Sequence, residues 1–263
     1  MFDSLAELEK LGVSAALCTI IRERGSVPRH SGSKMIVYAD GRIEGTIGGG
    51  EMESRVIKEA QAALGEGTTR IVSYQLVDPK AGDPGVCGGE VEIFVELIKP
   101  QPTLLVIGGG HVGKALVHLG KWLGFRVALS DDRPEFCSSE SAPGADQYLS
   151  MLITDLPGHF QFNSETYIVM STRGMPLDVE GLPTLLDAPH AYLGVIGSRR
   201  RWATAARRLE DKGVAKEKLA SVHAPMGLEL NAETPEEIAL SIMAEVVMLW
   251  RKGSGEPMKS FSA

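Results

Sequence analysis

The 263-residue sequence contains little cysteine and no long hydrophobic run. Its three cysteines, Cys18, Cys87 and Cys137, are odd in number and widely spaced, and none belongs to a CxxC pair. This favours reduced thiols over a disulfide framework, and so a cytoplasmic protein. No apolar run reaches the roughly 18 residues of a membrane helix, and the N-terminus lacks a signal pattern, so we expect no membrane partner. HExxH is also absent, which argues against a familiar zinc site.

Positive charge is scarce as well. The chain has 27 Lys and Arg against 34 Asp and Glu, for a net charge of -7. Because nucleic-acid binding needs a surplus of basic side chains, we expect no nucleic-acid partner. Glycine, by contrast, is plentiful, with 30 residues, and a GGG cluster occurs twice, at 48–50 and 108–110. Hydrophobic residues make up 43% of the chain, enough for the cores of one large or two ordinary soluble domains.

The first part of the chain, residues 1–99, predicts an α+β domain. Patterns typical of strands occur at residues 13–22, 35–47 and 86–97, and a helical pattern occurs at 51–64. Within 35–47, Asp40-Gly41 predicts a hairpin turn. Residues 86–97 end in alternating apolar and mostly acidic side chains, as in a half-buried strand. KPQP at 99–102 interrupts regular structure, so we expect the domain boundary there.

The remainder, residues 103–263, predicts a Rossmann-like domain. Short apolar segments at 104–107, 125–132, 166–172 and 191–198 alternate with helical stretches. Such alternation is typical of a parallel sheet covered by helices on both faces. The last helix has a capping-box signature, with Thr234 as N-cap, Pro235 at the first position and Glu237 two residues later. The expected fold class is therefore α/β, an α+β domain followed by a Rossmann-like domain.

The second glycine cluster has the dinucleotide-binding pattern GxGxxG. Gly108, Gly110 and Gly113 follow a predicted strand and open a predicted helix, the context that this fingerprint requires. Glycine lets the backbone approach a pyrophosphate, and the helix N-terminus offers N–H groups. Asp131 ends the next strand, where an acid can bind a ribose hydroxyl, and His111 is a candidate phosphate contact. A bound nucleotide and a turn kept only for packing both remain open.

Two further features of the predicted Rossmann-like domain involve basic residues. We expect Asp132 and Arg133 to form a local ion pair. Ser198 is a predicted N-cap for a helix that begins with three arginines, residues 199–201, and is also a candidate cofactor-binding residue. Because the helix dipole disfavours cations at this end, a bound anion would stabilise the cluster, although arginines spread around a solvated helix are the alternative.

The first glycine cluster predicts a second anion-binding turn. Gly48, Gly49 and Gly50 precede a predicted helix whose N–H groups can hold an anion. Arg29, in a Gly- and Ser-rich loop, is a candidate for the same ligand. Cys87 precedes two glycines and has little side-chain cover on that side, so it is a candidate binding residue, with a buried structural cysteine as the alternative. Residues Glu51 and Glu53 would repel a phosphate unless they turn away.

Together these motifs resemble the xanthine dehydrogenase accessory protein family, the maturation factors of xanthine and carbon monoxide dehydrogenases. In the first half the resemblance rests on GSVPRHSGSKMIV, GTIGGGEMESRVI and VCGGEVEIFVE. In the second half it rests on VIGGGHVGKAL, DDRPEF, GVIGSRRR and APMGLELNAETPEEIALSIMAE. It therefore extends over nearly the whole chain.

The resemblance implies a chaperone for molybdenum cofactor. Such a protein binds the molybdopterin, holds it while a cysteine desulfurase supplies the terminal sulfur, and delivers it to a xanthine dehydrogenase-type molybdoenzyme. It also implies a homodimer. Cys87 is then a candidate ligand for molybdenum or a carrier of sulfur, since both are soft. Our hypothesis is that each domain contributes an anion-binding turn and that the cofactor lies in a cleft between the domains.

The alternatives are an NAD(P)-dependent oxidoreductase and a nucleotide-sensing module built on the Rossmann domain. The sequence has no Tyr-x-x-x-Lys motif and no pair that we can assign as a His–acid proton relay, which counts against the oxidoreductase. We therefore favour a non-catalytic binding protein over an enzyme and assign no catalytic residue.

Overall fold

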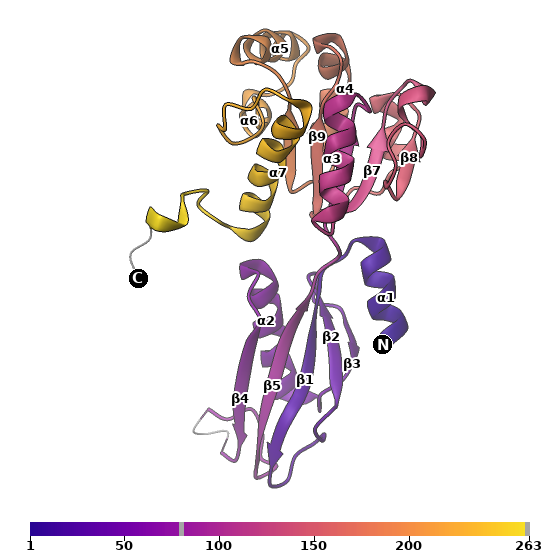
Figure 1. Ribbon diagram of the computed structural model, residues 1–263. Coiled ribbons are helices and arrows are strands. Elements are labelled where there is room, and N and C mark those ends of the chain that lie inside the picture. The colour runs from indigo at the N-terminus through magenta and orange to yellow at the C-terminus, as the bar shows by residue number, and fades with distance from the viewer. Residues whose placement is uncertain (79–81, 261–263) are drawn as a thin grey trace. The chain divides into compact units, whose positions relative to one another are not determined.

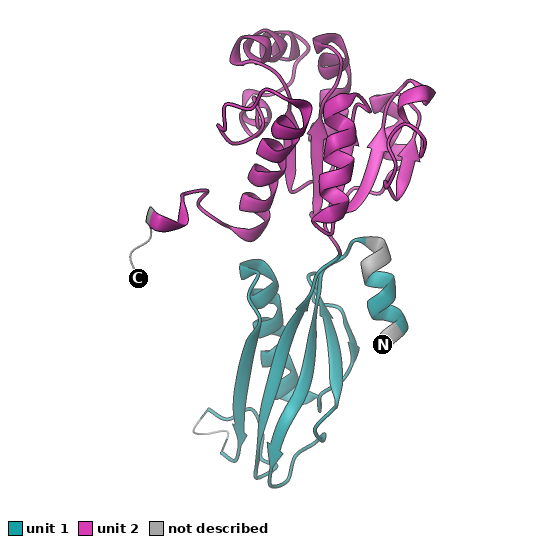
Figure 2. Ribbon diagram, in the orientation of Figure 1, with its two compact units in different colours: residues 1–100 teal, residues 101–263 magenta. Residues whose placement is uncertain are grey.

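The computed structural model describes residues 1–78 and 82–260. The chain forms two compact units, Met1–Pro100 and Gln101–Ala263, each with its own sheet and core (Figure 2). None of the helices in the described residues combines the length and the apolar character needed to cross a bilayer.

Unit 1 is built on an antiparallel sheet with the strand order β3-β2-β1-β5-β4 (Figure 1). Its strands are β1 (Ala15–Arg24), β2 (Lys34–Tyr38), β3 (Ile43–Gly45), β4 (Arg70–Leu76) and β5 (Gly89–Ile98). Helix α2 (Gly50–Glu66) packs its apolar stripe, which includes Met52 and Val56, on one face. On the other face, α1 (Phe2–Leu11) contributes Leu8 to a smaller cluster with Leu17.

The predicted hairpin and the predicted alternation are both confirmed. Strands β2 and β3 pair antiparallel, and Asp40 accepts a hydrogen bond from the Arg42 amide in the turn between them. Strand β5 buries Val91, Ile93 and Val95, because these side chains alternate with acidic ones on the opposite face. Strand β4 lies outside the segments expected to be strands, since this edge strand mixes Arg, Ser and Gln with its apolar residues.

Unit 2 is the Rossmann-like half, with a parallel sheet in the order β10-β9-β6-β7-β8. Its strands are β6 (Thr103–Ile107), β7 (Arg126–Ser130), β8 (Gln147–Leu149), β9 (Thr166–Met170) and β10 (Tyr192–Val195). Helices α3 (His111–Trp122) and α7 (Pro235–Arg251) pack on one face. The other face is covered by α4 (Met175–Asp187), α5 (Arg199–Asp211), α6 (Lys216–Ala220) and the short helix η3 (Ile153–Gly158). The expected α/β class is therefore confirmed.

The strand order of unit 2 reverses between β6 and β9. These strands are neighbours in the sheet, although β7 and β8 separate them in the sequence. In open α/β sheets a ligand crevice lies outside the carboxyl ends of the strands at such a reversal. The glycine turn 108–110 follows β6 and residues 171–173 follow β9, so these two segments meet at that position.

Both predicted helix starts are confirmed. The Thr234 hydroxyl accepts a hydrogen bond from the Glu237 amide at 3.2 Å, and the Glu237 carboxylate accepts one from the Thr234 amide at 3.0 Å, which completes the capping box of α7. The Ser198 hydroxyl caps α5 by accepting from the Arg201 amide at 3.2 Å.

Candidate functional site

In unit 1 the first glycine turn packs against the loop that carries Arg29. A methyl group built on Gly48 would lie 2.7 Å from Cγ of Pro28 in that loop. On its other side the loop reaches the glycine pair that follows Cys87, because a methyl group on Gly89 would lie 2.3 Å from the carbonyl oxygen of Ser26. The structure therefore brings three motifs that are distant in the sequence together on unit 1.

Cys87 is the accessible thiol of this cluster. Its side chain is exposed, as is that of Arg29. Cys18 and Cys137 are buried, and burial raises the pKa of Cys18 to about 12 and also raises the pKa of Cys137. No three His, Cys, Asp or Glu side chains within residues 1–78 and 82–260 are placed to hold a metal ion.

Glu53 occupies amide groups of the first glycine turn. Its Oε2 accepts hydrogen bonds from the Ile47 and Gly49 amides, both at 3.1 Å, and from the Thr46 hydroxyl at 2.5 Å. The two glutamates would repel an anion here unless they turn away, and only Glu51 does so, because it pairs with an arginine on the surface of α2, whereas Glu53 points toward the glycine amides. An anion at this turn therefore has only the first N–H groups of α2, which lack partners within the helix.

In unit 2 the fingerprint follows β6 and opens α3 as predicted, with Gly108 and Gly110 between the two elements and Gly113 in the first turn of the helix. Gly108 has φ +107°, a conformation that favours glycine, and Gly110 precedes α3 as its N-cap. A methyl group on Gly113 would lie 1.9 Å from the Gly108 carbonyl oxygen, so glycine at this position permits close packing of helix on strand. His111 is the first residue of α3 and is exposed.

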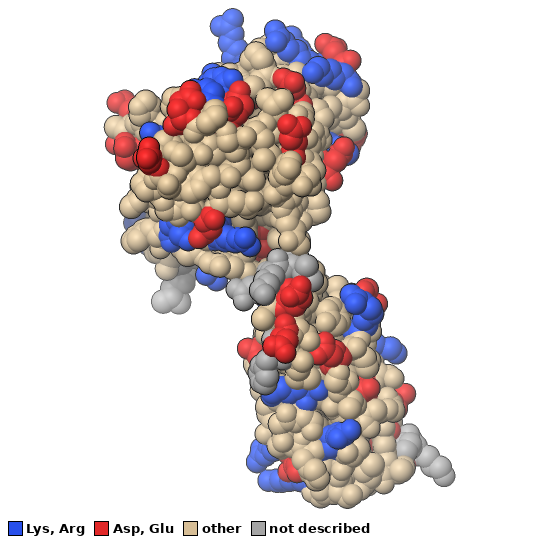
Figure 3. All heavy atoms as spheres, turned by 90° about the vertical axis from the view of Figure 1, so that its right-hand side faces the viewer, with Lys and Arg blue, Asp and Glu red and all other residues tan. Residues whose placement is uncertain are grey.

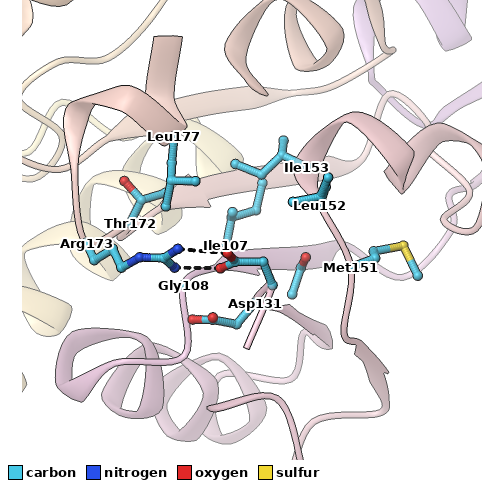
Figure 4. A pocket seen from close by; sticks show the side chains of 11 residues that line it. Ile107, Gly108, Asp131, Met151, Leu152, Ile153, Thr172, Arg173 and Leu177 are labelled. Atoms are coloured by element: carbon cyan, nitrogen blue, oxygen red, sulfur yellow. Dashed lines mark hydrogen bonds and ion pairs between the residues drawn. The ribbon is translucent and has the colours of Figure 1, made fainter. Parts of the chain in front are cut away.

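Asp131 turns toward the glycine turn and does not face open solvent. Its Oδ2 accepts a hydrogen bond from the Gly109 amide at 2.9 Å, and the Arg133 guanidinium contacts both oxygens. The expected ion pair between Asp132 and Arg133 is therefore wrong. Asp132 instead binds Arg173 through both oxygens, at 2.5 and 2.7 Å (Figure 4), and this pairing lowers the pKa of Asp132 to about 2.

A small cavity lies at the carboxyl ends of β6, β7 and β9 (Figure 4). Its volume is about 30 Å³, enough for one or two water molecules. Met151, Leu152 and Leu177 contribute apolar walls, and the Arg173–Asp132 pair borders it. The Ser130 hydroxyl also lines this cavity, is 1% exposed and has no partner in the described part of the chain.

His111 also lines an open groove between α3 and α7 of about 580 Å³. Lys114 and His118 lie on the α3 side of this groove, and Glu236 and Leu240 lie on the α7 side. The groove lies within unit 2 and begins beside the glycine turn, so a ligand contacting His111 would have room along α3.

Arg201, the third arginine of the cluster at residues 199–201, neither waits for a bound anion nor lies on the solvated face of the helix. Its Nη2 donates to Asp178 Oδ2 at 2.5 Å, and the Thr172 hydroxyl donates to the other oxygen of the same carboxylate. Asp178 is 1% exposed, so an internal carboxylate compensates this guanidinium where a bound anion was one expectation. Arg199 and Arg200 are exposed, as in the other expectation.

The structure also contains a His–acid pair that the sequence analysis missed. His223 Nδ1 lies 2.9 Å from Glu245, whose other oxygen accepts hydrogen bonds from the Tyr192 hydroxyl and the Gly227 amide, both at 2.6 Å. The two residues lie 22 positions apart, and no spacing signal joins them. These bonds attach the loop at residues 223–227 to α7 and β10, where His223 pairs in parallel with Gly194.

The exposed surface carries both signs of charge. On the face shown in Figure 3, small groups of Lys and Arg side chains and small groups of Asp and Glu side chains are scattered among uncharged residues.

The chain matches two protein-family models. A model described as the XdhC Rossmann domain matches residues 104–246, and a model described as the XdhC and CoxI family matches residues 8–75. The chain belongs to the XdhC family. The resemblance inferred from the separated motifs is thus confirmed.

The chain is similar in sequence to several bacterial proteins. The uncharacterized Escherichia coli protein YqeB is 35% identical over 257 residues, which are 97% of this chain and 47% of YqeB. A Bacillus subtilis protein, described as a probable subunit of xanthine dehydrogenase, is 32% identical over 155 residues, 59% of this chain and 45% of that protein. The molybdenum cofactor insertion chaperone PaoD of Escherichia coli is 26% identical over an alignment of 265 positions, gaps included, which covers 89% of this chain and 83% of PaoD. The chain therefore spans about half the length of the first two relatives.

A solved structure shares the XdhC fold. The crystal structure of a Bacillus halodurans protein described as a xanthine dehydrogenase matches with a TM-score of 0.53 and 21% identity, over 97% of this chain and 98% of the other.

Proposed function

We propose that this XdhC-family protein is a maturation factor that binds molybdenum cofactor and delivers it to a xanthine dehydrogenase-type molybdoenzyme. The observation that carries the proposal is the cluster on unit 1, where the exposed Cys87, the loop at residues 25–29 and the glycine turn 48–50 lie together. Membership of the family and similarity to PaoD, a named molybdenum cofactor insertion chaperone, support this choice of cargo.

The residues of the cluster suit the parts of this cargo. Cys87 offers a soft sulfur to molybdenum or to the sulfur bound to it. Arg29 and the first N–H groups of α2 offer positive charge to the phosphate. Gly49 and Gly88 have no atom within 4 Å of the place where a side chain would begin, so a ligand can approach the main chain there.

Glu53 limits where the phosphate binds. Since this carboxylate already accepts from the Ile47 and Gly49 amides, we place the phosphate on the helix side of the turn, at the amides of Gly50 and Glu51. A phosphate in that position lies beside the Glu53 carboxylate, and the positive charge of Arg29 then compensates the negative charge of the phosphate.

Further steps belong to the same proposal. A cysteine desulfurase supplies the terminal sulfur while the cofactor is held, and the protein acts as a homodimer in the cytoplasm. The contribution of the chain is binding, orientation and protection from water, and no residue is assigned a catalytic step.

Cofactor retention tests this function. Molybdenum cofactor is released anaerobically from a purified molybdoenzyme, mixed with the full chain and passed through gel filtration, and molybdenum and pterin are measured in the protein peak. We expect retention by the wild type, and loss of about ten-fold or more in affinity for Cys87→Ser and Arg29→Ala. Arg200→Ala, an exposed arginine of unit 2, is the matched control and should retain the cofactor.

Two results would count against the proposal. No retention by the wild-type protein would reject molybdenum cofactor as the cargo. Full retention by Cys87→Ser would leave the cargo in place but remove Cys87 from its binding site. Light scattering of the eluting peak reports at the same time whether the protein is a dimer.

A further inference from the structure

In unit 2 the short helix η2 (Pro134–Phe136) lies against the fingerprint turn. A methyl group built on Gly109 would lie 1.9 Å from the carbonyl oxygen of Phe136, so the two backbones are in direct contact. Gly109 stands at a variable position of GxGxxG, where pyrophosphate binding does not require glycine. Contact with the chain itself explains why glycine stands there.

The carboxylate that would bind a ribose is fully occupied. Asp131 Oδ1 accepts from the Arg133 amide at 3.0 Å and from Arg133 Nε at 2.9 Å. Its Oδ2 accepts from the Gly109 amide and from Arg133 Nη2, both at 2.9 Å. A carboxylate has about four lone-pair sites, and these four donors use all of them. The Asp131 side chain is only 2% exposed, so a ribose hydroxyl would have to displace the guanidinium.

Arg133 is held on a second side by an aromatic ring. The central carbon of its guanidinium lies 3.9 Å from the centroid of the Phe136 ring, a favourable cation–π distance. The same residue therefore neutralises Asp131 and packs on Phe136, and this keeps residues 133–136 seated on the turn.

Little space is left beside this segment for a base. The cavity at the strand ends measures about 30 Å³, whereas sites for nucleotide-sized ligands have roughly 300 Å³ or more. Arg173 and Asp132, joined by two hydrogen bonds across the sheet end, border that cavity (Figure 4). A nucleoside would therefore have to break this pair as well.

We propose that residues 133–136 fill the nucleoside half of the Rossmann site, so that this protein binds no NAD(P) or other adenine dinucleotide there. The inference is independent of the proposed cofactor-chaperone function, because it concerns a different unit and different residues. The fingerprint allows either a bound nucleotide or a turn that serves packing. In this chain the turn contacts Asp131 and η2 of the chain itself, as in the second alternative. No atom lies within 4 Å of a methyl group built on Gly110, so the turn is open at this residue. The proposal therefore concerns only the nucleoside half of the site.

Hydrogen exchange with and without nucleotide tests the closed site. The full chain is incubated with 1 mM NADH, and exchange is followed in peptides covering residues 105–113 and 129–138. We expect no change in either peptide. Protection of both peptides, together with saturable heat in calorimetry, would overturn the proposal. Protection confined to other peptides would support it, since the turn then stays closed.

A matched pair of arginine substitutions tests the cause. Arg133→Ala frees the acceptors of Asp131 and removes the guanidinium from Phe136, whereas Arg126→Ala changes an exposed arginine at the other end of β7. We expect faster exchange at 129–138 and new NADH-dependent protection in Arg133→Ala alone. If Arg133→Ala is folded by circular dichroism but shows the same exchange at residues 129–138 as the wild type, with and without NADH, this would contradict the role of the arginine.

Discussion

The carbonyl oxygen of Phe136 rests against the α-carbon of Gly109, at the place where any side chain would begin. Both partners are backbone atoms, so neither can rotate away to make room. The contact joins η2 to the fingerprint turn and identifies Gly109, at a variable position of the motif, as the glycine on which this part of the fold depends.

Two adjacent glycines should therefore differ in their response to substitution. Gly109→Ala places a methyl group in the Phe136 carbonyl and should lower the free energy of unfolding by about 2–3 kcal/mol. Gly110 has φ -68°, and the space that a methyl group would enter is open. We therefore expect Gly110→Ala to change the free energy of unfolding by no more than about 0.5 kcal/mol. Urea unfolding followed by tryptophan fluorescence reports on unit 2, because Trp122, Trp202 and Trp250 all belong to it. Equal effects of the two substitutions would refute the contact.

The buried Asp178 should make Arg201 far more important than its neighbour. Arg201→Ala leaves a carboxylate that is 1% exposed without its guanidinium, and should cost about 3 kcal/mol. Arg200→Ala removes an exposed side chain and should cost less than about 0.5 kcal/mol. Chemical unfolding followed by circular dichroism compares the two. A stability of Arg201→Ala close to that of the wild type would argue against a structural ion pair.

Glu53 should stabilise the first glycine turn more than Glu51 does. Glu53→Gln weakens the acceptor shared by the Ile47 and Gly49 amides and the Thr46 hydroxyl, so we expect a loss of about 1–2 kcal/mol. Glu51→Gln removes only a surface pair with Arg55, worth a few tenths of a kcal/mol. Hydrogen exchange of peptides spanning residues 44–53 should accelerate in the first variant alone, and unchanged exchange in Glu53→Gln would mean that the turn does not depend on Glu53.

The pairing of Asp132 with Arg173 predicts a dependence of stability on pH. The pKa of Asp132 is lowered to about 2 in the folded protein, against about 3.9 for an unperturbed aspartate. Because the folded value is the lower one, this contribution is present above about pH 4 and is lost as the pH falls through about 2. The wild type should therefore be more stable than Asp132→Asn at pH 6, and the difference should shrink toward pH 2. A difference that is constant across this range in unfolding experiments would exclude the effect.

Thiol labelling should distinguish the three cysteines. Cys87 is exposed, whereas Cys18 and Cys137 are buried, so native protein at pH 8 should incorporate one maleimide per chain, at Cys87. Three should be incorporated in urea. Mass spectrometry of the labelled peptides identifies the sites, and rapid native labelling of Cys137 would show that unit 2 opens at η2.

Much of the architecture follows from local sequence. The alternation of β5, the Asp40-Gly41 turn and the capping box of α7 depend on residues only a few positions apart. The strand–glycine–helix order around Gly108 is of the same kind. Hydrophobic period and turn chemistry act over such distances, so these elements could be predicted, whereas edge strand β4, with its mixed polar pattern, was missed.

The sequence by itself thus determined two sheets of different kinds and a fingerprint turn in unit 2. Tertiary structure alone decided which donor each buried carboxylate takes. Arg133 binds Asp131 where a pair with Asp132 was expected, and the partners of Arg201 and His223 lie 23 and 22 positions away. It also decided that Cys87 lies beside the loop at residues 25–29. The physical reason is that a charged side chain within a core binds whichever opposite group packing brings near, and packing depends on the whole unit.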